Sequence, residues 1–145
     1  LTPFQEHPGK GLFVLVRTSN PGASLWQTDT GTAEAVAEWV QAQAVATMGA
    51  DALGDVGAVV GATVPEEAAH WRDAMPNAWL LVPGFGAQGG TATTADPLFR
   101  SDGLGALVVS ARGVLYGDHV ASETNWQDAV RVRAQRLAAT FASKL

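Results

Sequence analysis

Residues 56–66 run Val56-Gly57-Ala58-Val59-Val60-Gly61-Ala62-Thr63-Val64-Pro65-Glu66 and contain a complete strand-to-helix transition. The first five residues are apolar without alternation, which is typical of a strand buried on both faces of a parallel sheet. The last four have the spacing of a capping box, in which Thr63 and Glu66 satisfy free backbone N–H groups, and they predict a helix start. That helix should end near Met75, because Pro76 disfavours its continuation.

The same design recurs along the chain. Three more continuous apolar runs predict strands at 12–16, 79–82 and 106–109. Apolar residues at four-residue spacing predict a helix over 33–48, closed by Gly49, and a capping box from Thr124 to Gln127 opens a last helix. The segment 84–105 is irregular, with one short helix expected near 96–101. Alternation of this kind predicts an α/β fold with a parallel sheet and right-handed crossovers.

Composition narrows the classes of function. The chain has 145 residues, enough for one domain, and a formal charge of −5 with only nine lysines and arginines. We therefore expect no nucleic-acid partner and no anionic membrane partner. There is no cysteine, no apolar run of the roughly 18 residues that span a bilayer, and no secretory pattern at the first residues, so we expect a cytoplasmic protein. His7, His70 and His119 show no ligand spacing, and we expect no metal site.

Small and polar residues gather where the predicted strands end. The four strand-end segments are Arg17–Ala23, Gly61–Thr63, Pro83–Gly90 and Ser110–Gly113. Because the carboxyl ends of parallel strands share one edge of a sheet, these segments predict a ligand site there.

Two neighbouring segments favour phosphate as part of that ligand. Arg112 can grip a phosphate through two parallel hydrogen bonds, and Gly113 leaves backbone N–H groups accessible. The turn 86–90 can add further amides. The alternative is that Arg112 is a surface ion-pair residue and the glycines only turn the chain. Residues 84–89 also match the G-x-G-x-x-G pattern of dinucleotide-binding folds, but Gly90-Thr91-Ala92-Thr93-Thr94 is a poor helix start, so we do not expect a dinucleotide site.

With the strand residues before two of them included, the four segments in this order resemble the C-terminal half of orotidine 5′-phosphate decarboxylases, in the bacterial subfamily of longer chains. The motifs that carry the resemblance are Arg17–Ala23, Val59–Thr63, Pro83–Gly90 and Val109–Gly113. The resemblance covers residues 1–145 and implies strands five to eight of a (β/α)₈ barrel, with the N-terminal half of the domain missing. It implies a carboxy-lyase that converts orotidine 5′-phosphate to uridine monophosphate and CO₂ in pyrimidine biosynthesis, without cofactor or metal. The family is dimeric, so a homodimer is expected of the full-length protein.

The resemblance also assigns substrate-binding residues. It implies that Ser19 meets the pyrimidine edge and that Pro83 lines the pocket near the departing carboxylate. Gln88 would reach between phosphate and base, while Arg112, with the Gly113 backbone, would hold the phosphate.

One departure from the family concerns catalysis. The family's alternating aspartates and lysines, of the Asp-x-Lys-x-x-Asp kind, have no counterpart here, since the only lysines are Lys10 and Lys144. No catalytic residue is therefore expected in this chain, and alone it should be inactive. Two alternatives stay open, a non-catalytic phosphate-binding half-barrel and another phosphate-binding barrel lyase or isomerase.

Overall fold

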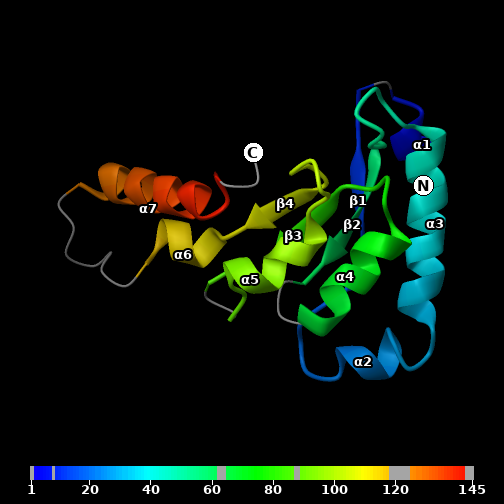
Figure 1. Cartoon of the computed structure of the whole chain (residues 1–145), viewed down its shortest axis with the longest axis horizontal. Helices are drawn as coiled ribbons and strands as arrows, with labels where there is room; N and C mark the ends of the chain where they lie inside the picture. The colour runs from blue at the N-terminus through cyan, green and yellow to red at the C-terminus, as the bar shows by residue number, and fades with distance from the viewer. Residues whose placement is uncertain (1, 8, 62–64, 87–88, 118–124, 143–145) are drawn as a thin grey trace.

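The computed structural model describes residues 2–7, 9–61, 65–86, 89–117 and 125–142. Strands and helices alternate along most of the chain (Figure 1). The strands are β1 (Leu12–Arg17), β2 (Val56–Val60), β3 (Leu80–Pro83) and β4 (Ala106–Val109). The longer helices are α3 (Thr32–Ala46), α4 (Pro65–Ala74) and α7 (Trp126–Thr140), and the short ones are α1 (Thr2–Gln5), α2 (Ala23–Trp26), α5 (Ala92–Ala95), the 3₁₀ turn η1 (Asp96–Leu98) and α6 (Ala111–Leu115).

The four strands form one parallel sheet in the order β1-β2-β3-β4. Every strand therefore lies beside its neighbour in the sequence, and each crossover carries at least one helical segment. The predicted α/β class and the predicted strand positions are confirmed, with boundaries within one residue of those expected. All four carboxyl ends lie at one edge of the sheet, as predicted.

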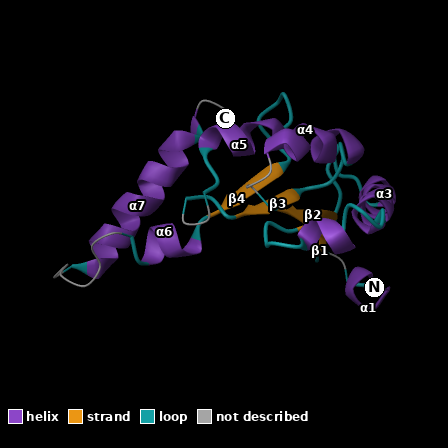
Figure 2. Ribbon diagram, turned by 90° about the horizontal axis from the view of Figure 1, so that it is seen from below, coloured by secondary structure: helices purple, strands orange, loops and turns teal. Residues whose placement is uncertain are grey.

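One face of the sheet carries the core. Figure 2 shows α4 and α5 along this face, with α3 beside β1 and β2. The residues packed between them are apolar; the largest fully buried ones are Trp71, Met75, Leu80, Leu98, Val40, Val56, Val60 and Val82. The central strand β2 is buried almost throughout. These contacts supply the apolar burial that holds the helices on the sheet.

The opposite face of the sheet is open, which contradicts the expectation that every strand is buried on both faces. Phe13 and Leu15 of β1 are 41% and 55% exposed, and Leu107 and Val109 of β4 are 43% and 40% exposed. Burial in β1 and β4 alternates because no described element covers this second face. The side chains of β1 and β4 are apolar on both faces, as in strands that are buried on both faces, but only the face toward the helices is buried.

The space beside β4 is also apolar. A cavity of about 550 Å³ lies between β4 and α7 and is lined by Trp79, Phe99, Leu107, Leu137 and Phe141 among other residues. Phe141 also makes ring contacts with Phe85 and Phe99. Within the described chain β4 has only β3 as a partner, so its outer backbone groups are unpaired.

A buried arginine joins α4 to the amino ends of two strands. The Arg72 guanidinium donates hydrogen bonds to the carbonyl oxygens of Leu98 (3.3 Å), Gly105 (3.0 Å), Ala78 (2.8 Å) and Met75. Burial, which disfavours the charged form, lowers the pKa of Arg72 to about 10, and the nearby Arg100 charge acts in the same direction. The four carbonyls compensate for the water that this cation loses.

Two helix ends differ from the sequence prediction. Helix α3 ends at Ala46, and its cap is Thr47 rather than Gly49. The cap of α7 is Asn125, whose side chain accepts from the Asp128 N–H, so the box proposed from Thr124 to Gln127 is wrong by one residue.

The irregular segment after β3 also contains a helix start that the sequence analysis rejected. Thr91 and Thr94 form a reciprocal capping box that opens α5 at Ala92, four residues before the expected helix. Two threonine hydroxyls satisfy backbone groups here that apolar patterning could not indicate.

Among the described residues, no helix is long and apolar enough to cross a membrane.

Candidate functional site

The turn after β1 lies against the end of β2. Ser19 is exposed, and it contacts Gly61 so closely that a Cβ on Gly61 would lie 3.3 Å from both the Cβ and the N of Ser19. The Gly61 N–H also donates to the Arg17 carbonyl at 2.9 Å. The glycine at the end of β2 thus lets the backbone of the Ser19 turn approach.

A bulge at the end of β1 directs Arg17 into the protein. Leu15 pairs with Val59, but Arg17 pairs with Val60, so β1 carries one extra residue. Val16 and Arg17 are consequently both buried, although they are consecutive. A bulge of this kind re-aims a side chain that strict alternation would place on the other face.

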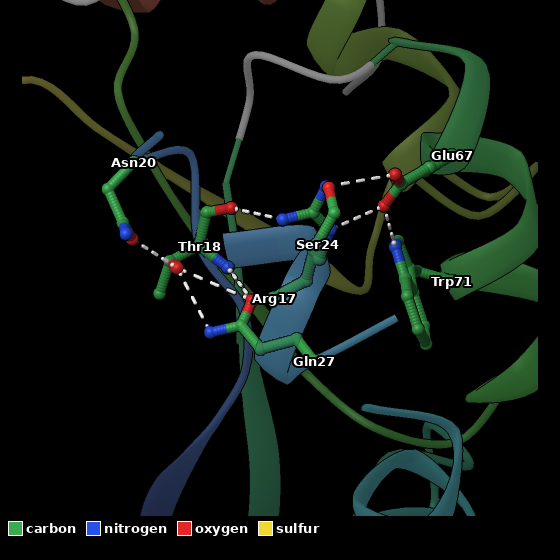
Figure 3. A network of polar contacts seen from close by, with 7 residues as sticks. All are labelled: Arg17, Thr18, Asn20, Ser24, Gln27, Glu67 and Trp71. Carbon is green, nitrogen blue, oxygen red and sulfur yellow. Dashed lines mark hydrogen bonds and ion pairs between the residues drawn. The ribbon is translucent and has the colours of Figure 1, made fainter. Parts of the chain in front are cut away.

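Arg17 makes a two-pronged ion pair with Glu67 in the first turn of α4 (Figure 3). Its Nε and Nη2 donate to the two Glu67 carboxylate oxygens at 2.7 and 3.0 Å, and its Nη1 donates to the Thr18 carbonyl at 2.7 Å. The buried Trp71 donates its indole N–H to the same carboxylate at 3.1 Å. The paired guanidinium lowers the pKa of Glu67 and, through the same hydrogen bonds, raises the pKa of Arg17; burial opposes both changes.

The other side of Thr18 is held by Gln27, just beyond α2. The Gln27 side-chain oxygen accepts from the Thr18 N–H at 3.0 Å, and its amide nitrogen donates to the Thr18 hydroxyl at 3.0 Å. That hydroxyl in turn donates to the Asn20 side chain. The N–H, the hydroxyl and the carbonyl of Thr18 are therefore all bound within the protein.

At the other end of the same edge, Pro83 and Arg112 line one small cavity. It has a volume of about 110 Å³ and is formed by the ends of β3 and β4. The Ser110 hydroxyl donates to the Phe85 carbonyl at 3.2 Å and joins the two loops. The structure thus brings together two of the predicted residues, Pro83 and Arg112. Pro83 pairs with Val109 at the end of β4, and Arg112 follows Val109 in the next loop.

The described residues of the glycine-rich turn do not offer the open set of amides expected from the sequence. Gly86 donates its N–H to Gly90, Gly89 to Gly86, and Gly90 to Gly84. Gly84, Gly86 and Gly89 all have positive φ, which closes the turn on itself. The described amides of this turn are therefore used internally. Gln88 lies outside the described residues.

Gly113 lies in the first turn of α6, where N–H groups have no partner within a helix. A Cβ at this position would lie 2.7 Å from the Ser110 hydroxyl, so a larger residue here would displace the Ser110 side chain. Gly86 and Gly113 line a second cavity of about 290 Å³ together with Arg133 and Arg136 of α7. Two further cations therefore lie near the Arg112 loop.

Several residues at this edge could not be recognised from the sequence. Arg133 and Arg136 carried no signal because arginines along a helix are typical of its solvated face. Glu67 carried none because its partner Arg17 is 50 residues away in the sequence. In the described part of the chain, no three histidine or acidic side chains lie close enough to hold a metal ion.

Comparison with known proteins identifies the family. No family model matches the chain. The orotidine 5′-phosphate decarboxylase of Rhodopirellula baltica is 45% identical over 144 residues, which covers 90% of this chain and 48% of the relative. Among solved structures, Leishmania donovani UMP synthase matches 97% of this chain and 30% of its own, with 34% identity and a TM-score of 0.71. Leishmania donovani OMP decarboxylase matches 97% of this chain and 52% of its own, with 31% identity and a TM-score of 0.67.

These matches confirm the resemblance drawn from the four strand-end segments. The chain spans about half the length of the curated relatives it matches, in agreement with the prediction of a C-terminal half. Its four parallel strands and their helices are correspondingly part of a (β/α)₈ barrel rather than a complete one. The chain belongs to the orotidine 5′-phosphate decarboxylase family.

Proposed function

We propose that the protein of which this chain is a part decarboxylates orotidine 5′-phosphate, and that the chain supplies the phosphate- and pyrimidine-binding half of the site. The names and the similarity of its relatives support this reaction. The observation that carries the assignment of the binding half is the cavity shared by Pro83 and Arg112 at the carboxyl edge. Ser19 lies at the same edge, at the end of β1.

In this proposal the phosphate lies at the ends of β3 and β4. Arg112 supplies a guanidinium that can bind two phosphate oxygens, and Gly113 supplies a backbone N–H. Arg133 and Arg136 add positive charge to the adjacent cavity. Gln88 is assigned by the resemblance alone, as a contact between phosphate and base.

The pyrimidine would extend from the phosphate toward Ser19, whose hydroxyl and N–H can bind its polar edge. In the reaction the bond from the pyrimidine carbon to the carboxylate breaks, the electron pair stays on that carbon, and a proton then replaces the released CO₂. Pro83 provides an apolar wall, which favours neutral CO₂ over a carboxylate. Binding energy from the remote phosphate can hold this arrangement while the bond breaks.

The charged groups that would stabilise the electron pair are proposed to lie in the missing half of the domain. The chain has only two lysines, Lys10 and Lys144. Lys10 precedes the amino end of β1, and Lys144 lies outside the described residues. Residues 1–145 are thus proposed as one part of a single barrel domain, inactive alone. We also propose that the complete protein is cytoplasmic and, as the family resemblance implies, a homodimer. We propose that it binds no nucleic acid, because the chain carries a net charge of −5.

The experiment joins the chain with the N-terminal half of the R. baltica enzyme, expressed together, and follows the absorbance of orotidine 5′-phosphate. We expect turnover by the pair and none by the chain alone. Arg112→Ala should lower kcat/KM by about 100-fold, the range for loss of a charged hydrogen-bonding partner. Arg131→Ala is the matched control, since it removes an exposed arginine whose described partners, Asp128 and Gln135, lie within α7.

Three outcomes would contradict the proposal. One is turnover by the chain alone, and another is an Arg112→Ala pair as active as its control. The third is phosphate binding without turnover by any pair, which would favour the alternative of a non-catalytic half-barrel.

A further inference from the structure

We propose that Glu67 and Arg17 are positioning residues, which hold the Thr18–Asn20 turn in the conformation that presents Ser19 to the pyrimidine. The inference rests on the proposed function for its ligand, but the turn and its contacts are independent of it. Glu67 lies on α4, which follows β2 rather than β1, and its carboxylate binds Arg17 and Trp71. Its influence on the ligand would pass through Arg17 and Thr18.

The contacts of Arg17 connect the core to the turn. Its side chain is 6% exposed, and its three nitrogens are all in use. Two bind Glu67, one of these also contacts the Ser24 hydroxyl at 3.4 Å, and the third binds the Thr18 carbonyl. The Thr18 carbonyl belongs to the peptide bond that Ser19 shares, so fixing this oxygen fixes the plane from which Ser19 departs.

Glu67 is itself held in place on the core side. Its carboxylate accepts from the indole of Trp71, one helical turn further along α4, and Trp71 is 1% exposed. An ion pair with this geometry loses little side-chain freedom, because both partners are already restrained by packing. The restraint passes from buried Trp71 through Glu67 and Arg17 to an exposed turn.

Gln27 completes the restraint on the opposite side of Thr18 by binding its N–H and its hydroxyl. Gly61 leaves room for Ser19 directly above the end of β2. The turn therefore has little freedom at Thr18 while Ser19 itself remains exposed. A binding residue on a surface turn needs such support, since an exposed turn without it is mobile and binding then costs ordering entropy.

The first test uses the 145-residue chain and no ligand. Glu67→Gln keeps the shape of the side chain and removes its charge, and Glu66→Gln is the matched control at an adjacent exposed position. Amide hydrogen exchange is measured by NMR at Thr18, whose N–H binds Gln27, and at Ala58, whose N–H binds the Trp79 carbonyl inside the sheet. We expect exchange at Thr18 to rise at least tenfold in Glu67→Gln and exchange at Ala58 to stay unchanged.

Two results in this test would overturn the inference. Unchanged exchange at Thr18 would show that Glu67 does not hold the turn. Equal increases at Thr18 and Ala58 would show general destabilisation of the fold. Neither result depends on whether the protein is a decarboxylase.

The second test uses the chain expressed with the N-terminal half of the R. baltica enzyme. We expect Glu67→Gln to lower kcat/KM for orotidine 5′-phosphate about tenfold, well within the 100-fold range that misplacement of a contact group can produce. Inhibition by inorganic phosphate should not change, because the proposed phosphate site lies at β3 and β4. In a Ser19→Ala background, Glu67→Gln should have almost no additional effect, since both changes remove the same contact.

Additive effects of Ser19→Ala and Glu67→Gln would overturn the inference, and so would an equal loss of phosphate inhibition. Absence of turnover in the unsubstituted pair would instead contradict the proposed function. The exchange measurements would then decide by themselves whether Glu67 holds the turn.

Discussion

Replacing Arg72 by methionine should destabilise the chain by about 2–5 kcal/mol, a large part of the 5–15 kcal/mol typical of a folded domain. Methionine has a similar length and no donor, so the change removes all the hydrogen bonds of the guanidinium. Two of the four carbonyls keep another backbone partner, because Gly105 also accepts from Leu80 and Met75 also accepts from Ala78. The described contacts give Leu98 and Ala78 no such second donor for their carbonyls.

The magnitude follows from those two buried carbonyls. Each buried acceptor left without a partner costs about 1–3 kcal/mol, which gives about 2–6 kcal/mol for both. Removing the buried cation offsets part of this loss of stability, because burial disfavours the charged guanidinium. The pKa of Arg72, lowered to about 10, reflects that cost. The expected net loss is therefore somewhat smaller than the sum.

The assay is urea unfolding of the chain, followed by tryptophan fluorescence and by far-ultraviolet circular dichroism. Arg131→Met is the matched control, since Arg131 lies on α7 in an exposed ion pair worth no more than about 1 kcal/mol. Arg72→Lys should fall between the two, because one ammonium cannot reach all four carbonyls. If Arg72→Met unfolded at the same urea concentration as Arg131→Met, the role assigned to the buried guanidinium would be wrong.

Three further predictions concern the carboxyl edge and the open face. The pKa of Glu67 is lowered from its usual 4.5, so its ionised form stabilises the fold above that pH, and the contribution should disappear as the pH falls through the lower folded value; acid unfolding of Glu67→Gln should lack this step. Gly61→Ala should cost about 1–3 kcal/mol by crowding Ser19, and the Ser19 amide resonance should move, whereas an unmoved resonance would contradict the close contact. Leu15→Gln should lower the free energy of unfolding by less than about 1 kcal/mol, since this side chain is 55% exposed. It should also reduce self-association measured by sedimentation, because it makes the open apolar face more polar. A larger loss of stability would mean that this face is covered.

Apolar patterning was sufficient to predict the strands and their parallel order. The runs at 12–16 and 106–109 are apolar at every position, as in a strand covered on both sides. They therefore could not indicate that Leu15 and Leu107 lie on an open face. Whether the second face of the sheet is buried depends on other parts of the domain that pack against it. The residue pattern within a strand does not indicate whether those parts are present. The relatives are about twice as long, in agreement with this explanation.

The candidate site was predictable only where it depends on strand ends. Pro83 and Arg112 share a cavity because adjacent parallel strands end side by side. The Arg17–Glu67 pair depends on a bulge between Leu15 and Arg17, for which the apolar run gives no sign. Hydrogen bonding within the turn 86–90 depends on glycines at positive φ, and the same glycines were equally compatible with an open ring of amides.

Helix α4 carries the two arginine contacts described above at its opposite ends. Glu67 in its first turn faces the carboxyl rim, whereas Arg72 in its last turn binds carbonyls that precede β3 and β4. Directed evolution of new substrate preference can therefore randomise the turns around Ser19 and Arg112 while leaving the Arg72 end untouched. Libraries restricted in this way should keep a higher proportion of folded clones than libraries spread evenly over the same helix.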